Sequence, residues 1–218
     1  MKKTIINGIL AFTITSLAPQ IIQAQGTVYL SNLGQASGSS VAVGSNSWLA
    51  AIFFTGTNAG GYVLNSIQLV MTDASGSPSG FTVMLYTSEA IAPIPQTNLG
   101  TLDGSADPVT VGTYTYTDDS NLILPPHTPY FIVLTAGTAV ANGSYYWSLA
   151  NALSYNSSDD WFHVAGYDSS SNGSTWLNNS GAPQFAVTAT PVPEPSTLCL
   201  FALGGLGFLW HHRKAKTV

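Results

Sequence analysis

The sequence predicts an all-β fold: a single antiparallel β-sandwich or jelly-roll-like domain, placed between an N-terminal signal helix and a C-terminal transmembrane helix. Short runs of β-branched and aromatic residues recur along the chain. Clusters of Gly, Pro, Asn and Ser separate these runs and are typical of turns. Outside the two ends, no stretch has the 3.6-residue apolar period of a helix. Many short strands at this spacing favour a sandwich or a jelly roll.

The first 24 residues have the parts of a secretory signal peptide. Lys2 and Lys3 precede an apolar stretch from Ile5 to Leu17, and the small residue Ala24 stands at the expected cleavage position. This stretch is shorter than the ~20 apolar residues that span a bilayer, which favours cleavage over a retained anchor. We therefore expect the Sec machinery to export the chain.

Residues 25–190 form the predicted exported domain, which is long enough to bury one core. In the run 81–86, Phe81, Val83 and Leu85 face one side of a strand and the intervening residues face the other. The same reading gives nine expected strands: Thr27–Leu33, Leu49–Phe54, Tyr62–Met71, Phe81–Tyr86, Thr110–Thr117, Tyr130–Thr135, Tyr145–Leu149, Trp161–Tyr167 and Phe185–Ala189.

Residues 191–218 form a tail of three parts. The first is Pro193, Glu194 and Pro195, and the second is an apolar segment, 198–210, expected to be a transmembrane helix. The third is a basic cluster of Arg213, Lys214 and Lys216, which stays in the cytoplasm by the positive-inside rule. Lys2 and Lys3 also start on that side, so both ends point inward and the domain between them is exported.

The charges are confined in an unusual way. The five Lys and Arg residues all lie in the two ends, so residues 4–212 carry none, and the ten acidic residues all lie between 73 and 194. Nucleic-acid binding is therefore excluded, because phosphate neutralisation needs clustered cations.

The tail closely resembles the PEP-CTERM sorting signal of Gram-negative bacteria, in the order Pro-Glu-Pro, short apolar helix, Arg-Lys. The resemblance implies a partner, the membrane protease exosortase, that cuts near the Pro-Glu-Pro. It also implies transient residence in the inner membrane, and then a place at the cell surface or in the extracellular matrix, often with extracellular polysaccharide. The same tail is also called an ice-binding protein C-terminal domain, which we take as a name for the tail only.

The body resembles a bacterial surface domain called choice-of-anchor R. The resemblance covers about residues 28–189 and is carried by a series of short motifs: Ser31–Gln35, Ser47–Ala50, Phe53–Gly56, Tyr62–Leu69, Val83–Tyr86, Leu124–Tyr130, Tyr146–Trp147 and Gln184–Val187. It implies an exported β domain and gives no catalytic residue.

The residues themselves give little support to an enzyme. The one cysteine, Cys199, lies in the tail, and the body has only His127 and His163, with no Gly-x-Ser-x-Gly motif. We expect no catalytic residue and no obligatory cofactor. A carbohydrate-active enzyme, which would need two facing carboxylates, is a remote alternative.

Two kinds of ligand site stay open. Asp118, Asp119, Asp159 and Asp160 lie in oxygen-rich loops that could hold Ca²⁺, although such loops are more often solvated turns. Trp161 and Trp176 flank a Gly/Ser/Asn-rich stretch and could stack against sugar rings, although aromatic side chains of sandwiches are as often in the core. The sequence thus favours a non-enzymatic surface or matrix protein, with a carbohydrate-binding module, calcium-dependent or not, as the alternative.

Overall fold

The computed structural model describes residues 26–89, 93–104 and 106–194, so the expected signal helix and transmembrane helix lie outside the described residues. Among these residues, no helix is long and apolar enough to cross a membrane. The described elements are the strands β1 (Thr27–Ser31), β2 (Ser37–Val43), β3 (Trp48–Phe54), β4 (Tyr62–Gly76), β5 (Thr82–Ser88), β6 (Pro95–Gly104), β7 (Gly112–Thr117), β8 (Ile123–Leu124), β9 (Pro129–Thr135), β10 (Gly143–Ala150), β11 (Asn156–Ser157), β12 (Phe162–His163), β13 (Tyr167–Ser170), β14 (Leu177–Asn179) and β15 (Phe185–Pro191), and the short 3-10 helix η1 (Val140–Asn142).

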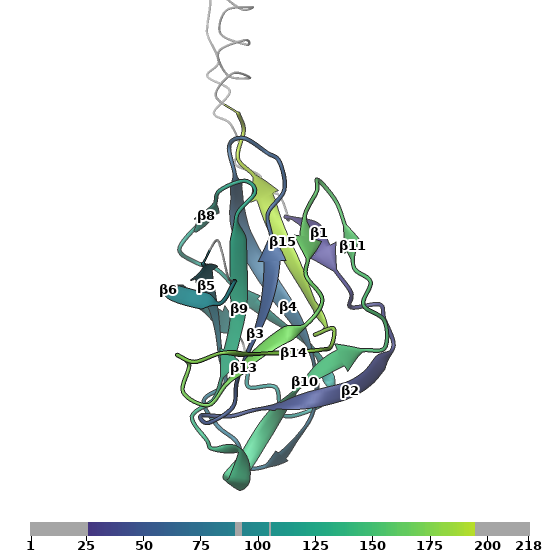
Figure 1. Cartoon of the computed structure of the whole chain (residues 1–218), viewed down its shortest axis with the longest axis vertical. Coiled ribbons are helices and arrows are strands. Elements are labelled where there is room, and N and C mark those ends of the chain that lie inside the picture. The colour runs from purple at the N-terminus through teal and green to yellow at the C-terminus, as the bar shows by residue number, and fades with distance from the viewer. Residues whose placement is uncertain (1–25, 90–92, 105, 195–218) are drawn as a thin grey trace, which may run out of the picture.

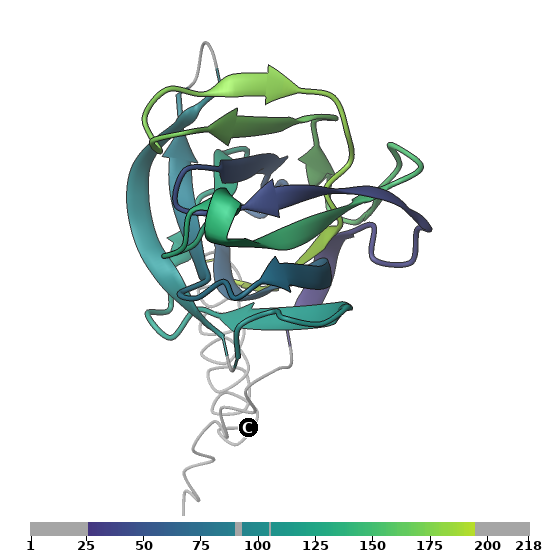
Figure 2. The same cartoon turned by 90° about the horizontal axis from the view of Figure 1, so that it is seen from below.

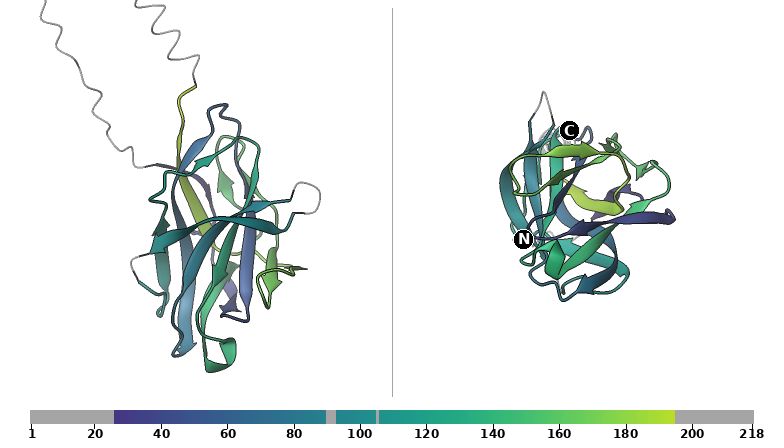
Figure 3. Two further views of the ribbon diagram at one scale, coloured as in Figure 1. Left: turned by 90° about the vertical axis from the view of Figure 1, so that its left-hand side faces the viewer. Right: turned by 60° about the horizontal axis from the view of Figure 1, so that its bottom comes forward.

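The strands pair antiparallel and fall into two groups (Figure 1). The first group centres on the long β4, which pairs with β15, β7, β8 and β10. The second runs in the order β6-β5-β9-β3-β13-β14, with β12 also on β3. The left panel of Figure 3 shows β6 crossing the upright strands. Because β6 pairs with β5 through Leu102 and with β7 through Asp103, one continuous sheet includes both groups.

The core lies between the inner faces of the two groups, and the view from below shows strands around this interior (Figure 2). Strand β3 contributes Leu49, Ala51 and Phe53, and β4 contributes alternate residues such as Ile67 and Leu69. All five are almost fully buried. The prediction of an antiparallel all-β fold is confirmed, and the arrangement is consistent with a β-sandwich. The finer jelly-roll description stays a prediction.

The single strand expected over Trp161–Tyr167 is wrong. The segment forms two short strands, β12 and β13, separated by residues 164–166. Gly166 has φ +119° in this connection, a conformation that side chains disfavour. The break lets β12 and β13 pair with different stretches of the same strand, β3.

A buried polar network joins the segment after β1 to the start of β15. Asn32 Nδ2 donates to the carbonyl of Pro183 (3.0 Å), and Asn32 Oδ1 accepts from the backbone N–H of Phe185 (2.8 Å). Gln184 Oε1 accepts from Ser37 (2.7 Å) and from Ser148 (2.6 Å). Since the body has no Lys or Arg, neutral bonds of this kind replace ion pairs in fixing buried polar groups.

Candidate functional site

The tail begins directly at the folded body, without a linker. Strand β15 stays paired with β4 as far as Pro191, opposite Tyr62. The next residue, Val192, is held at both of its backbone groups: its N–H donates to Gly61 O (2.9 Å), and its carbonyl accepts from Asn58 Nδ2 (3.0 Å). Pro193 therefore follows a residue that the body holds, and Glu194, the next residue, is exposed.

The turn that holds Val192, residues 58–61, fits closely against it, and we call it the clasp. Gly61 has φ +76°, and a Cβ on Gly60 would lie 2.5 Å from the carbonyl oxygen of Val192. Behind the turn, the N–H of Asn58 donates to Tyr62 Oη (2.9 Å), which itself donates to Asp159. The clasp therefore needs glycine at its two last positions.

Both ends of the body leave from the same pole. Strand β1 is antiparallel to β15, with Thr27 opposite Ala189, so the first described residues lie beside the last (Figure 1). The expected signal peptide and the tail are thus attached at one pole, which suits a body attached to one membrane surface.

The two tryptophans named as candidates for stacking against sugar rings lie in different surroundings. Trp161 is 1 % exposed and lies in the core between Tyr29 and Phe53, whose rings stack with it at 5.1 and 5.8 Å between centroids. Its ring offers no face to a ligand, which removes Trp161 from the candidates. Trp176 is half-buried and packs on the opposite side of β3.

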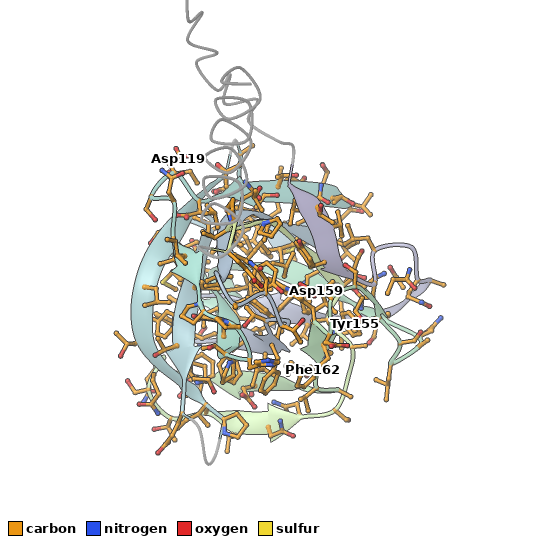
Figure 4. The ribbon with its side chains drawn as sticks, turned by 90° about the horizontal axis from the view of Figure 1, so that it is seen from above. Asp119, Tyr155, Asp159 and Phe162 are labelled. Atoms are coloured by element: carbon orange, nitrogen blue, oxygen red, sulfur yellow. The ribbon has the colours of Figure 1, made fainter. Side chains whose placement is uncertain are left out.

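The four aspartates named as candidate calcium ligands do not come together. Figure 4 shows Asp119 at the rim of the body, well apart from Asp159. The carboxylate of Asp118 accepts from the backbone N–H groups of Ser120 (3.1 Å) and Leu122 (2.6 Å), and Asp159 accepts from Tyr62 and Thr57. Asp118 and Asp119 do line a cavity of about 340 Å³. Over the described residues, however, no group of three or more His, Cys, Asp or Glu side chains could hold a metal.

Asp160 lies in an exposed turn, whereas the nearby His163 packs into the body. Asp160 is exposed and has φ +57°, as in a turn. The Nδ1 atom of His163 lies 2.6 Å from Ile52 O, so Nδ1 carries the proton and donates it to the carbonyl. Its ring packs against those of Tyr155 and Phe185. Burial lowers the pKa of His163 to about 4, so the ring is neutral at pH 7.

Sequence reasoning missed one surface, the outer face of the second strand group. The registers place Ala50 and Ile52 of β3 beside Val133 and Phe131 of β9 on this face. These four residues are buried. Around them lie five less buried rings that we call the aromatic rim: Trp48, Phe54, Tyr86, Phe162 and Trp176. The sequence of β3 could have predicted this surface, because every residue of β3 is apolar, as expected for a strand covered on both faces.

The comparison with known families matches residues 191–214 to the PEP-CTERM protein-sorting motif. This motif implies export, membrane-associated sorting to the cell surface and processing by an exosortase membrane enzyme. The match covers the tail alone, and the comparisons give no support to the choice-of-anchor R body or to the ice-binding label. No curated protein and no solved structure matches the chain.

Proposed function

We propose that the chain is a non-enzymatic cell-surface or extracellular-matrix protein of a Gram-negative bacterium, exported by the Sec machinery and sorted by its tail. The observation that carries this proposal is the sorting motif at 191–214, which begins at the last residue of β15. The tail keeps the folded body at the inner membrane until an exosortase cuts near Pro195. The body then leaves with its fold intact, because β15 ends before the cut.

The short distance between body and motif has a mechanical consequence. Val192 is fixed by the clasp, and the apolar segment begins at Leu198, so five residues join the two. At about 3.3 Å per extended residue, this stretch spans less than ~20 Å. The pole that carries the clasp is therefore held close to the membrane surface, where the protease acts.

The second candidate function is carbohydrate binding. It is favoured by half-buried aromatic rings on the outer face, Trp176 among them, in a domain without Lys or Arg. Calcium dependence is a weaker form of this candidate, because the carboxylates of Asp118 and Asp159 already accept hydrogen bonds within the protein. A carbohydrate-active enzyme stays the remote alternative.

The sorting proposal is tested by removing residues 195–218 and by the substitution Glu194→Gln in the full chain. We expect the truncated protein to be lost from the cell surface. We expect Glu194→Gln to accumulate uncut in the membrane, as seen by intact mass after cell fractionation. The matched control is Glu89→Gln, which changes the only other glutamate of the chain and should be cut normally. Normal surface delivery without the tail would contradict the proposal.

A further inference from the structure

The aromatic rim gathers partly uncovered rings on one face of the body, whereas the exposed aliphatic side chains elsewhere, such as Val111 and Leu153, belong to separate segments. Phe162 is 48 % exposed and stacks on Phe54, with 4.3 Å between ring centroids and an interplanar angle of 8°. Trp48 and Phe54 lie at opposite ends of β3, so the rim extends over ~20 Å at about 3.3 Å per residue. An exposed patch of this kind on an exported protein marks an interaction surface.

Polar groups lie beside the rings on the same face. Asp168 is opposite Ala50 in the register, and Asn178 is opposite Asp168, so all three side chains share the outer face. Asp168 is 6 % exposed, and its carboxylate accepts from Asn178 Nδ2 (3.1 Å). Both side chains line a cavity of about 60 Å³ whose floor is Ala50, Ile52 and Phe131. Pockets that enclose a small molecule measure about 300–1,000 Å³, so this cavity is too small to enclose one. A ligand of this face would therefore lie across its surface.

One donor on the rim has no acceptor. The Nε1–H of Trp176 is buried and makes no hydrogen bond with the described residues. An indole N–H normally finds an acceptor when it is buried. The ring of Trp176 packs on the buried residues of the outer face, and a ligand hydroxyl that reached Nε1 would supply the missing acceptor.

The charges on this face define the ligand further. Asp168 is the only charged side chain that the strand registers place there, and residues 4–212 contain no Lys or Arg. Recognition of an anionic polymer would need cations, and a basic partner would need more than one buried carboxylate. A neutral ligand with apolar C–H surfaces and many hydroxyl groups fits the rings, the amide of Asn178 and the carboxylate of Asp168.

We propose that the aromatic rim and the Asp168–Asn178 pair form a binding site for a neutral oligosaccharide stretch of an extracellular polysaccharide. This inference rests on the second proposed function, carbohydrate binding, and assigns it a site and a ligand charge. Sugar rings lie flat on Trp176 and Phe162, and their hydroxyl groups bond to the polar pair at the edge.

The test is affinity electrophoresis of the processed protein recovered from its cells. Native gels contain dextran, mannan or galactan as neutral probes and alginate as the anionic one. We expect retardation by at least one neutral polymer, unchanged when salt is raised, because no ion pair contributes. Trp176→Ala and Phe162→Ala should each weaken retention about ten-fold, the loss of one stacked ring. Trp176→Phe, which keeps a ring, should retain most of the binding.

The matched control is Leu177→Ala, which removes a side chain 67 % exposed on the same hairpin but on the opposite side of β14. It should bind like the unchanged protein, and near-ultraviolet circular dichroism should show that every variant is folded. Retention that survives both ring removals would overturn the site while leaving carbohydrate binding in place. Absence of retention on every polymer would overturn both. Dimers by sedimentation that Phe162→Ala dissociates would show that a second copy covers the face instead.

Discussion

Phe53 and Phe54 are neighbours on β3, yet they lie in different environments. Phe53 points inward, is fully buried and packs between Tyr130 and Trp161. Phe54 points outward, is half-buried and stacks on Phe162, which is itself exposed. Because strand side chains alternate between faces, one strand serves two purposes. The inner face holds the fold together, and the outer face keeps apolar surface available for a partner.

The largest effect expected from this difference is on stability. Phe53→Ala opens a cavity among enclosed rings and should lower the free energy of unfolding by about 3–5 kcal/mol. Phe54→Ala removes a ring at a surface that can relax, and we expect about 1 kcal/mol. Urea denaturation of the processed protein measures both. Equal losses would mean that the outer face is as tightly packed as the core.

Side chains also alternate between the two faces on β12, and this makes the stability of the fold depend on pH. Phe162 faces outward, whereas His163 faces inward against Tyr155 and Phe185. The pKa of His163 is about 4 when folded and about 6.5 when unfolded, so the unfolded state binds the proton first as the pH falls. The contribution of His163 is complete above pH 6.5 and is lost through pH 4, about 3 kcal/mol in all.

This loss is measured as the free energy of unfolding against pH. His163→Gln keeps a donor for Ile52 O but cannot titrate, so its curve between pH 6.5 and 4 should be flatter. His127→Asn is the control, because His127 is exposed and its φ of +51° suits asparagine. A His163→Gln curve as steep as that of the unchanged protein would assign the acid sensitivity to other groups.

The strands that the sequence predicted were those with apolar side chains. It missed five strands. Three of them, β8, β11 and β14, are only two or three residues long, and the other two, β2 (SGSSVAV) and β6, are mostly polar and exposed, with β2 paired to β10. Hydrogen bonding to a neighbour defines them, and no local pattern records that. The position of Trp161 stayed open for a related reason, because its ring is buried by Tyr29 and Phe53, which are distant in sequence. The tail, by contrast, could be predicted from the sequence, because a sorting motif is recognised as a linear stretch of residues and does not depend on contacts between distant segments.

The side-chain amides of Asn32 and Asn178 allow the same comparison between the inside and the outer face, with smaller expected losses of stability. Asn32→Ala would leave the buried N–H of Phe185 without its acceptor and would remove one of the two hydrogen bonds to Pro183 O, the other coming from Tyr155 Oη, at a cost of about 2 kcal/mol. Asn178→Ala, at the exposed edge of the outer face, should cost less than about 1 kcal/mol but weaken polysaccharide retention. Thermal unfolding and affinity electrophoresis of the two variants separate these effects. If Asn178→Ala proved the more destabilising, the Asp168–Asn178 pair would be structural.

The smallest expected change in stability is at the clasp. Gly60→Ala places a Cβ 2.5 Å from Val192 O, and backbone on both sides cannot move cheaply, so the end of β15 should detach from residues 58–61. The cost to global unfolding should stay below about 1 kcal/mol, because only the terminal bonds of β15 open. Hydrogen exchange should nevertheless show that the amide of Val192, which donates to Gly61 O, loses its protection. Gly34→Ala is the matched control, because a Cβ at Gly34 meets no atom within 4 Å. Unchanged protection of Val192 in Gly60→Ala would mean that residues 58–61 do not hold the start of the sorting motif, and that the motif is attached to the body through β15 alone.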